Sequence, residues 1–222
     1  MNKRLDLTRG RIVALCIGLP LTLVAICATS LHTLGDLAAG SYPVHFQVPA
    51  NGRTVTLSIK GGDIHVATSP SRLVKLHGRA LYSLLRPVVG YRVTGFTIVM
   101  KSRCRLPITE CAFNYHLALP SGVSASLTDG NGNITASYLL SQDVTAVSHA
   151  GNITLSFAVV PDNVDVTTSL GHITLVLPPG NTTYRIDASA PLGTSTIRVP
   201  TSPASSHVLI VTDTSGSITI TN

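Results

Sequence analysis

The 222-residue chain contains no tryptophan, and aromatic residues make up only 5% of it. Charged residues make up 12%, about half of the usual share of roughly 25%. Low charge together with a hydrophobic fraction of 44% argues against an intrinsically disordered chain. A helical bundle is also disfavoured, because it would need many Glu, Lys, Leu and Ala residues. Gly, Ser, Thr, Val and Ile are abundant in place of the charged and aromatic residues, and this composition predicts an all-β protein with many turns.

The sequence also lacks the short motifs that identify common enzyme classes. There is no Gly-x-Ser-x-Gly, no His-Glu-x-x-His and no Ser-x-x-Lys with a supporting motif. Its ten acidic residues are mostly single, so no catalytic pair of carboxylates is indicated. Its eight histidines are scattered along the chain, and a lone histidine on a strand is more often structural than catalytic. We therefore predict that the protein is not an enzyme and has no cofactor and no metal site.

One long apolar run lies near the N-terminus. Residues 12–31 read IVALCIGLPLTLVAICATSL and contain no charge. At 1.5 Å per residue, such a run spans the ~30 Å hydrocarbon layer of a bilayer. Pro20 lies in its middle, where a membrane helix tolerates a kink. The run therefore predicts one N-terminal transmembrane helix.

Positive charges before this run set its orientation. Residues 1–11 contain four basic residues and one acidic residue, and no Lys or Arg follows the run until Arg53. By the positive-inside rule, residues 1–11 are cytoplasmic and the chain after His32 is extracytoplasmic. The alternative is a cleaved signal peptide, whose apolar region normally has roughly 7–15 residues. The longer run favours a signal anchor, and hence a single-pass protein of the cell membrane.

The four cysteines fall into two pairs. Cys16 and Cys27 lie inside the apolar run, where cysteine behaves as a small hydrophobic residue. Cys104 and Cys111 lie in the exported part, and a disulfide between them is expected in an oxidising compartment. A metal site is the weaker alternative, because two more ligands would be needed and no Cys-x-x-Cys or His-x-x-x-His accompanies the pair.

Charge is divided unevenly along the exported part. Residues 32–111 contain ten basic and three acidic residues, whereas residues 112–222 contain two basic and six acidic ones. Eight basic residues lie between Asp63 and Glu110 with no acidic residue among them: Arg72, Lys75, Arg79, Arg86, Arg92, Lys101, Arg103 and Arg105. A solvated face near the membrane is the favoured interpretation. The alternative is a patch for anionic lipid headgroups or an anionic envelope polymer. Nucleic acid is not an expected partner, since the exported part has few aromatic residues for base stacking.

The distal half contains an internal repeat. The phrase Gly-polar-Ile-Thr-apolar starts at Gly132, Gly151, Gly171 and Gly216, with a degenerate copy at Gly193. These glycines are 19, 20, 22 and 23 residues apart. A second phrase of alternating apolar and polar residues precedes each copy, so each repeat reads as strand, glycine turn, strand. A further copy, Gly62-Asp63-Ile64, lies far upstream.

Such units bury their apolar faces only by stacking on one another. In a stack, equivalent strands pair in register and Ile lies above Ile. We therefore predict a β-solenoid of two-strand repeats, each of about twenty residues, in which the repeat glycines supply positive φ at each corner. Two of the three glycosylation sequons, at Asn133 and Asn152, are the repeat phrase itself and are interpreted as structural turns. A calcium loop at residues 129–133 is disfavoured, because the required Gly and Glu are absent.

The membrane-proximal half is less regular. Residues 53–60, 96–101 and 114–119 read as strands. Residues 72–86 fit a helix or a strand, and Gly78 favours a strand for the first nine residues. The expected organisation is a cytoplasmic N-terminus (1–11), a transmembrane helix (12–31), a linker (32–44) and a β-repeat domain (45–222). Within the last, residues 45–120 are irregular and 121–222 regular.

The chain resembles the bacterial DUF4097 family of candidate adhesins with β-strand repeats. The residues that carry this resemblance are Gly61 to Val66, His116 to Val123 and the Gly-x-Ile-Thr copies up to the C-terminus. The likeness covers about residues 45–222 and implies a β-solenoid in the cell envelope. The cysteine pair and the basic stretch are not features of that pattern.

The expected function is that of a non-enzymatic, membrane-anchored binding or scaffold module of the cell surface. Its partner would be an anionic envelope polymer, lipid headgroups or another protein. The alternative is an accessory protein of an envelope-stress or membrane-sensing system, which some relatives of the family accompany. Neighbouring genes for a membrane sensor or regulator would favour that alternative.

Overall fold

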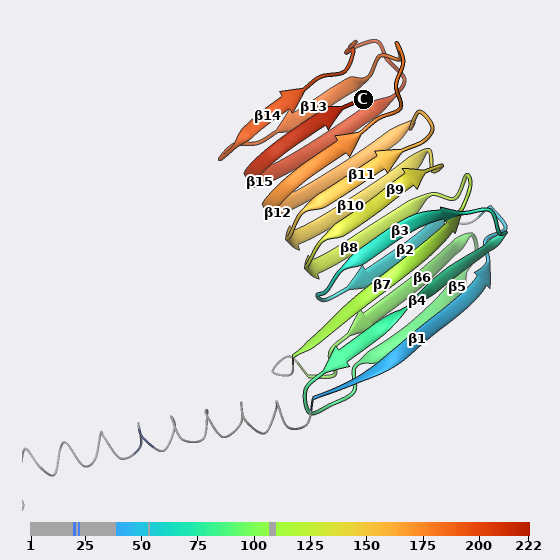
Figure 1. Ribbon diagram of the computed structural model, residues 1–222, viewed down its shortest axis with the longest axis vertical. Helices are drawn as coiled ribbons and strands as arrows, with labels where there is room; N and C mark the ends of the chain where they lie inside the picture. Colours follow the sequence, from blue (N-terminus) through green and yellow to red (C-terminus); the bar gives the residue numbers. More distant parts are fainter. Residues whose placement is uncertain (1–19, 21, 23–38, 53, 107–109) are drawn as a thin grey trace, which may run out of the picture.

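The computed structural model describes residues 20, 22, 39–52, 54–106 and 110–222. The predicted transmembrane run, residues 12–31, therefore lies outside the described residues apart from Pro20 and Thr22. In the described part of the chain, no helix has the length and apolar character that crossing a bilayer requires. The same part is all-β, as predicted, and its strands join in one sheet (Figure 1).

Fifteen strands are present in these described ranges. They are β1 (Gly40–Pro49), β2 (Thr54–Ile59), β3 (Ile64–Ser69), β4 (Leu73–Tyr82), β5 (Val88–Thr94), β6 (Thr97–Arg103), β7 (Cys111–Pro120), β8 (Ala125–Asn131), β9 (Ile134–Leu139), β10 (Asp143–Ala150), β11 (Ile153–Phe157), β12 (Asn163–Val176), β13 (Arg185–Ser189), β14 (Thr194–Ile197) and β15 (Val208–Thr221). The expected linker ends earlier than residue 44, because β1 begins at Gly40. The segment 72–86, for which both helix and strand were open, forms strand β4.

The sheet runs out along one layer and returns along a second. Its order is β1-β4-β7-β3-β9-β11-β12 and then β12-β10-β8-β2-β6-β5. The turning point is β12, whose first half pairs with β10 and whose second half pairs with β11. The long strand β15 repeats this arrangement beyond β12. The sheet is thus nearly closed, and we call the β1-to-β11 side the first layer and the β10-to-β5 side the second layer.

The core lies between the layers and follows from the strict alternation of the strands. In β2, for example, Val55, Leu57 and Ile59 are buried and the residues between them are only partly covered. The buried apolar side chains of both layers form a single cluster. Tyr115 of the first layer and Ser102 of the second bridge this core through a buried hydroxyl–hydroxyl hydrogen bond of 2.9 Å. One core therefore supports both outer faces.

The repeats of the distal half stack in parallel and in register. Ile153 pairs with Ile134 and with Ile173, and Ile173 pairs with Ile218. All four isoleucines are at most 1% exposed. The upstream copy joins the same stack, since Ile64 of β3 pairs with Ile134. Equivalent residues of successive repeats therefore lie directly above one another, although the first copy is separated from the second by some 70 residues of sequence.

The repeat glycines are positions of close approach between neighbouring repeats. Gly151 and Gly171 have φ of 151° and 156°, in the range that favours glycine. A Cβ on Gly171 would overlap the carbonyl oxygen of Gly151, and one on Gly216 would overlap that of Gly171. The predicted positive φ is present at Gly132, Gly151 and Gly171, but the prediction is wrong for Gly193 and Gly216. The expectation of a tight turn is wrong for Gly171 and Gly216, which lie inside the continuous strands β12 and β15. At these two glycines one continuous strand bends and passes from one layer to the other. Because glycine has no Cβ, the backbones of neighbouring repeats can lie in contact there.

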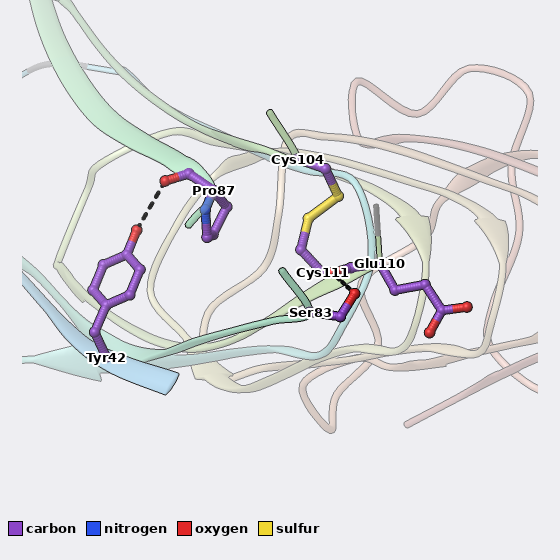
Figure 2. Close-up of a disulfide and its surroundings, with 6 residues drawn as sticks. All are labelled: Tyr42, Ser83, Pro87, Cys104, Glu110 and Cys111. Atoms are coloured by element: carbon purple, nitrogen blue, oxygen red, sulfur yellow. Dashed lines mark hydrogen bonds between the residues drawn. A yellow bond between two sulfur atoms is a disulfide. The ribbon is translucent and has the colours of Figure 1, made fainter. Parts of the chain in front are cut away.

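The predicted disulfide between Cys104 and Cys111 is present (Figure 2). It joins the chain just after β6 in the second layer to the start of β7 in the first. Beside it, the carbonyl oxygen of Glu110 accepts hydrogen bonds from the backbone N–H (3.1 Å) and the hydroxyl (3.4 Å) of Ser83. The Tyr42 hydroxyl donates to the carbonyl oxygen of Pro87 at 3.2 Å. This region, which we call the disulfide end, links the two layers where β1 begins.

Candidate functional site: a histidine and threonine face

Four of the eight histidines lie side by side on the outer surface of the first layer. They are in adjacent strands and at the same register position. In spatial order they are His45 on β1, His77 on β4, His116 on β7 and His65 on β3. All four side chains are exposed. We call these four residues the histidine row.

The rings of the histidine row are stacked. The ring centroids of His77 and His116 are 5.1 Å apart with 13° between the planes, and those of His116 and His65 are 5.0 Å apart with 18°. His45, His77 and His116 line a hollow of about 550 Å³, and His65, His77 and His116 line another of about 290 Å³. The rings therefore lie in a shallow depression that is open to solvent.

Few charged groups accompany these rings. Lys75 and Arg79 lie two residues before and after His77 on β4 and share its outward side. Asp63, just before β3, is engaged by Asn133, whose backbone N–H and side-chain amide donate to its Oδ1 at 3.0 and 3.1 Å. Loss of solvation lowers the pKa of His116, and the nearby His65 and His77 lower it further. Both causes favour the neutral form of the His116 imidazole.

A row of threonines continues the histidine row across the repeats. His65 pairs with Thr135, and the register then runs through successive strands of the first layer. The five threonines are Thr135, Thr154, Thr174, Thr219 and Thr196. With about 4.8 Å between neighbouring strands, nine aligned side chains cover about 40 Å. We call this surface the histidine–threonine face.

A chain of side chain–backbone hydrogen bonds runs beside the threonines. The Asn133 Oδ1 accepts from the backbone N–H of Asn152, and the Asn152 Oδ1 accepts from that of His172, both at 2.9 Å. His172 Nδ1 in turn is 2.9 Å from the Ser217 hydroxyl oxygen. The repeated polar residue after each glycine therefore ties its repeat to the next. This is the structural role expected for the sequons at Asn133 and Asn152.

The structure divides the eight basic residues among different surfaces. Arg86, Arg103 and Arg105 lie at the disulfide end, and Lys75 and Arg79 flank the histidine row. Arg92, Lys101 and Arg103 line a hollow of about 690 Å³ at strands β5 and β6 of the second layer. Arg72 precedes β4 at the opposite end, where its carbonyl oxygen accepts from the backbone N–H of Ala50. The basic stretch of the sequence is thus several small groups in space.

Sequence reasoning missed the histidine row. Each of its members directly follows a buried residue, as His116 follows Tyr115, and this pattern identifies an outward position. It does not identify neighbours, because the spatial order β1-β4-β7-β3 differs from the chain order. In the described part of the chain, no three His, Cys, Asp or Glu side chains already converge as a metal site would require. The rings are stacked side by side instead.

Comparisons with known proteins identify the fold. No family model matches the chain, and no curated protein matches it either. A solved structure named a "putative cell adhesion protein" from Clostridium sporogenes matches 82% of this chain and 99% of its own, with 16% identity and a TM-score of 0.58. A "putative adhesin" from Bacteroides fragilis matches 82% and 97%, with 13% identity and a TM-score of 0.34. Only the first superposition is close enough to show a shared fold.

Proposed function

We propose that this chain is a non-enzymatic, membrane-anchored module of the cell envelope that binds a partner through its histidine–threonine face. In this proposal the stack is a β-solenoid of the DUF4097 type, with residues 1–11 in the cytoplasm and the β-domain outside. The observation that carries it is the alignment of this face, on which nine strands present polar side chains at the same register position. The fold shared with the structure named a putative cell adhesion protein supports the same function.

The chemistry of this face suits a partner with repeated hydrogen-bonding groups. Threonine hydroxyls donate and accept, and their spacing of about 4.8 Å follows from the strand separation. The histidine rings extend the row with stacked flat surfaces. Stacked repeats provide extended surfaces of this kind for binding. An anionic envelope polymer is favoured as the partner, because Lys75 and Arg79 flank the row.

Binding would be measured with the full chain in lipid nanodiscs and envelope polymer purified from the same cells. Thr154→Glu and Thr174→Glu place a negative charge in the middle of the face, where it repels an anionic polymer, and we expect at least a tenfold loss of affinity. The matched control is Thr145→Glu, because Thr145 points outward from β10 in the second layer. Equal affinities of all three variants would exclude the histidine–threonine face as the binding surface. Cross-linking of this face to a membrane protein instead would favour the accessory role.

The described residues also suggest how the domain would lie on its membrane. Gly40, where β1 begins, is beside Tyr82 and the disulfide end. If residues 12–31 span the bilayer, the eight residues that follow before Gly40 reach at most about 28 Å. The disulfide end would then face the lipid headgroups with Arg86, Arg103 and Arg105. Each basic residue close to an anionic surface contributes about 1 kcal/mol.

The absence of tryptophan allows a direct test of this orientation. Leu85→Trp places a fluorescent reporter at the disulfide end, and Phe96→Trp places one in the turn between β5 and β6 at the opposite end. Both native side chains are exposed, at 37% and 80%. In bilayers of brominated lipid we expect quenching of Leu85→Trp and none of Phe96→Trp. The opposite result would overturn the orientation, and protection of the repeats from external protease in spheroplasts would overturn the topology.

A further inference from the structure

We propose that the histidine row binds a divalent transition-metal ion, with His116 as the central ligand. This inference rests on the row alone and holds whether or not the face also binds an envelope partner. Four imidazoles on adjacent strands are the ligand type that Zn²⁺, Cu²⁺ and Ni²⁺ prefer. No carboxylate belongs to the row, which disfavours Ca²⁺ and Mg²⁺ because these ions require oxygen ligands.

The spacing of the rings suits an ion held between neighbouring histidines. Two nitrogens that bind one tetrahedral zinc ion at about 2.0–2.1 Å lie about 3.4 Å apart. The ring centroids on either side of His116 are 5.0 and 5.1 Å away. If two neighbouring rings tilt so that their edges approach each other, their nitrogens can reach the separation that one zinc ion requires. The side chains are exposed, so they are free to change rotamer.

His116 is shared by both stacked ring pairs, with His77 on one side and His65 on the other. His77 also has two neighbours in register, His45 and His116, whereas His45 and His65 have one each. An ion above His116 can be held by two of these rings, with water in the remaining positions. Rotation of the third ring would complete a three-histidine site.

Protonation and nearby charges define the conditions for binding. A metal ion binds the neutral imidazole, so protons compete with it. The charged groups that face the row are Lys75 and Arg79 on β4 and Asp63 before β3; β1, β7 and β9 add none on this side. The two cations oppose a divalent ion, and Asp63 is occupied by Asn133. We therefore expect modest affinity at neutral pH and weaker binding in acid, where protons compete with the ion for the imidazole nitrogens.

The test uses the untagged full chain in detergent, titrated with ZnCl₂ and with CuCl₂ by isothermal calorimetry. The central variant is His116→Gln, and the matched control is His149→Gln, an exposed histidine on β10 of the second layer. We expect His116→Gln to weaken binding at least tenfold and His149→Gln to change it less than twofold. Circular dichroism of each variant establishes that the fold is retained. Electron paramagnetic resonance of the Cu²⁺ complex should show coupling to two or three imidazole nitrogens.

Two results would overturn the proposal. The first is unchanged affinity in both His116→Gln and the double variant His77→Gln/His116→Gln. The second is a Cu²⁺ spectrum without imidazole coupling. Metal binding that is lost in His149→Gln instead would place the ion elsewhere and would also refute the assignment. None of these outcomes bears on polymer binding, which the threonine variants measure separately.

Discussion

The two halves of the β-domain build the same layers with different strand arrangements. In residues 121–222 each repeat lies parallel to the one before it, and equivalent residues pair. In residues 40–120 the pairs β1–β4, β4–β7 and β5–β6 are antiparallel, and β1, β4 and β7 are neighbours in space although they are distant in sequence. In the distal half the outer surface therefore repeats the sequence motif. In the proximal half the outer surface combines residues that no motif relates.

This difference determines what each half can do. The distal half presents a uniform row of threonines, because one position of the repeat occupies one line on the surface. The proximal half presents the histidine row, whose four members come from four unrelated segments. Both rows occupy the same register line, since β3 pairs with β9 and joins the two halves. The stack of strands thus places the four histidines in line with the row of threonines.

The largest loss of stability is expected at the glycines where neighbouring distal repeats are in backbone contact. Gly171→Val places side-chain atoms where the backbone carbonyl of Gly151 lies, and backbone cannot move aside cheaply. We expect a loss of about 4 kcal/mol or more in the free energy of unfolding, measured by urea denaturation. The control is Gly180→Val, because Gly180 has a similar φ of 147° but nothing within 4 Å of its Cβ position. Equal losses would show that backbone conformation, and not stacking, requires the glycine.

The alternation of the repeat strand predicts the next effect. Ile173 is fully buried in the isoleucine stack, so Ile173→Ala should cost about 2–5 kcal/mol. Thr174 follows it on the outer face, and Thr174→Ala should change stability by less than about 0.5 kcal/mol. Thermal or urea unfolding of both variants measures the contrast. Similar losses at the two positions would mean that this strand is covered on both faces.

Much of the distal half could be predicted from sequence, and much of the proximal half could not. The repeat phrase identifies Ile153 and Ile173 as equivalent, and equivalence predicts stacking directly. His77 and His116 have no such relation, and only the antiparallel pairing of β4 with β7 brings them together. The burial of two aspartates was also not predicted from the sequence. Asp129 and Asp213 occur in polar contexts, yet they are 1% and 0% exposed because each occupies the next inward position of its strand, after Leu127 and Val211 respectively.

The disulfide is expected to contribute stability in the proximal half alone. Cys104→Ser/Cys111→Ser opens the link between the ends of β6 and β7, and the short loop it closes predicts a loss of about 2–3 kcal/mol. The distal repeats should keep their hydrogen-exchange protection in this variant, since none of their strands contacts the bond. Thiol labelling of the denatured, non-reduced wild-type chain should find only Cys16 and Cys27 reactive. Two additional reactive thiols would contradict the assignment.

The last effect depends on pH and concerns the inner corner of the repeats, where one column of polar residues lies against the glycines. The Ser148 hydroxyl donates to the carbonyl oxygen of Gly132 at 3.0 Å, and that of Thr168 donates to Gly151 at 3.1 Å. Asp129 pairs with Ser148 in the same column. Its Oδ2 is buried without a hydrogen-bond partner, and it lies close to the carbonyl oxygen of Gly62. A protonated carboxyl at Asp129 can donate there as the hydroxyls do.

The pKa of Asp129 is raised from its ordinary 3.8 to about 7, mainly because the carboxyl is buried; the backbone N–H of Asn131 opposes this rise, and the nearby Asp63 adds to it. A raised folded-state pKa means that the unfolded chain loses this proton first. The stabilisation is therefore complete below about pH 4 and is lost as the pH rises to about 7, by about 1 kcal/mol per pH unit. Asp129→Asn keeps a donor toward Gly62 without a charge. Urea denaturation between pH 4 and 8 should show a flatter stability profile for this variant than for the wild-type chain. The exposed Asp143→Asn serves as the control and should retain the wild-type slope. A wild-type stability that increases over this range, with no change of slope in Asp129→Asn, would mean that Asp129 is ionised in the fold.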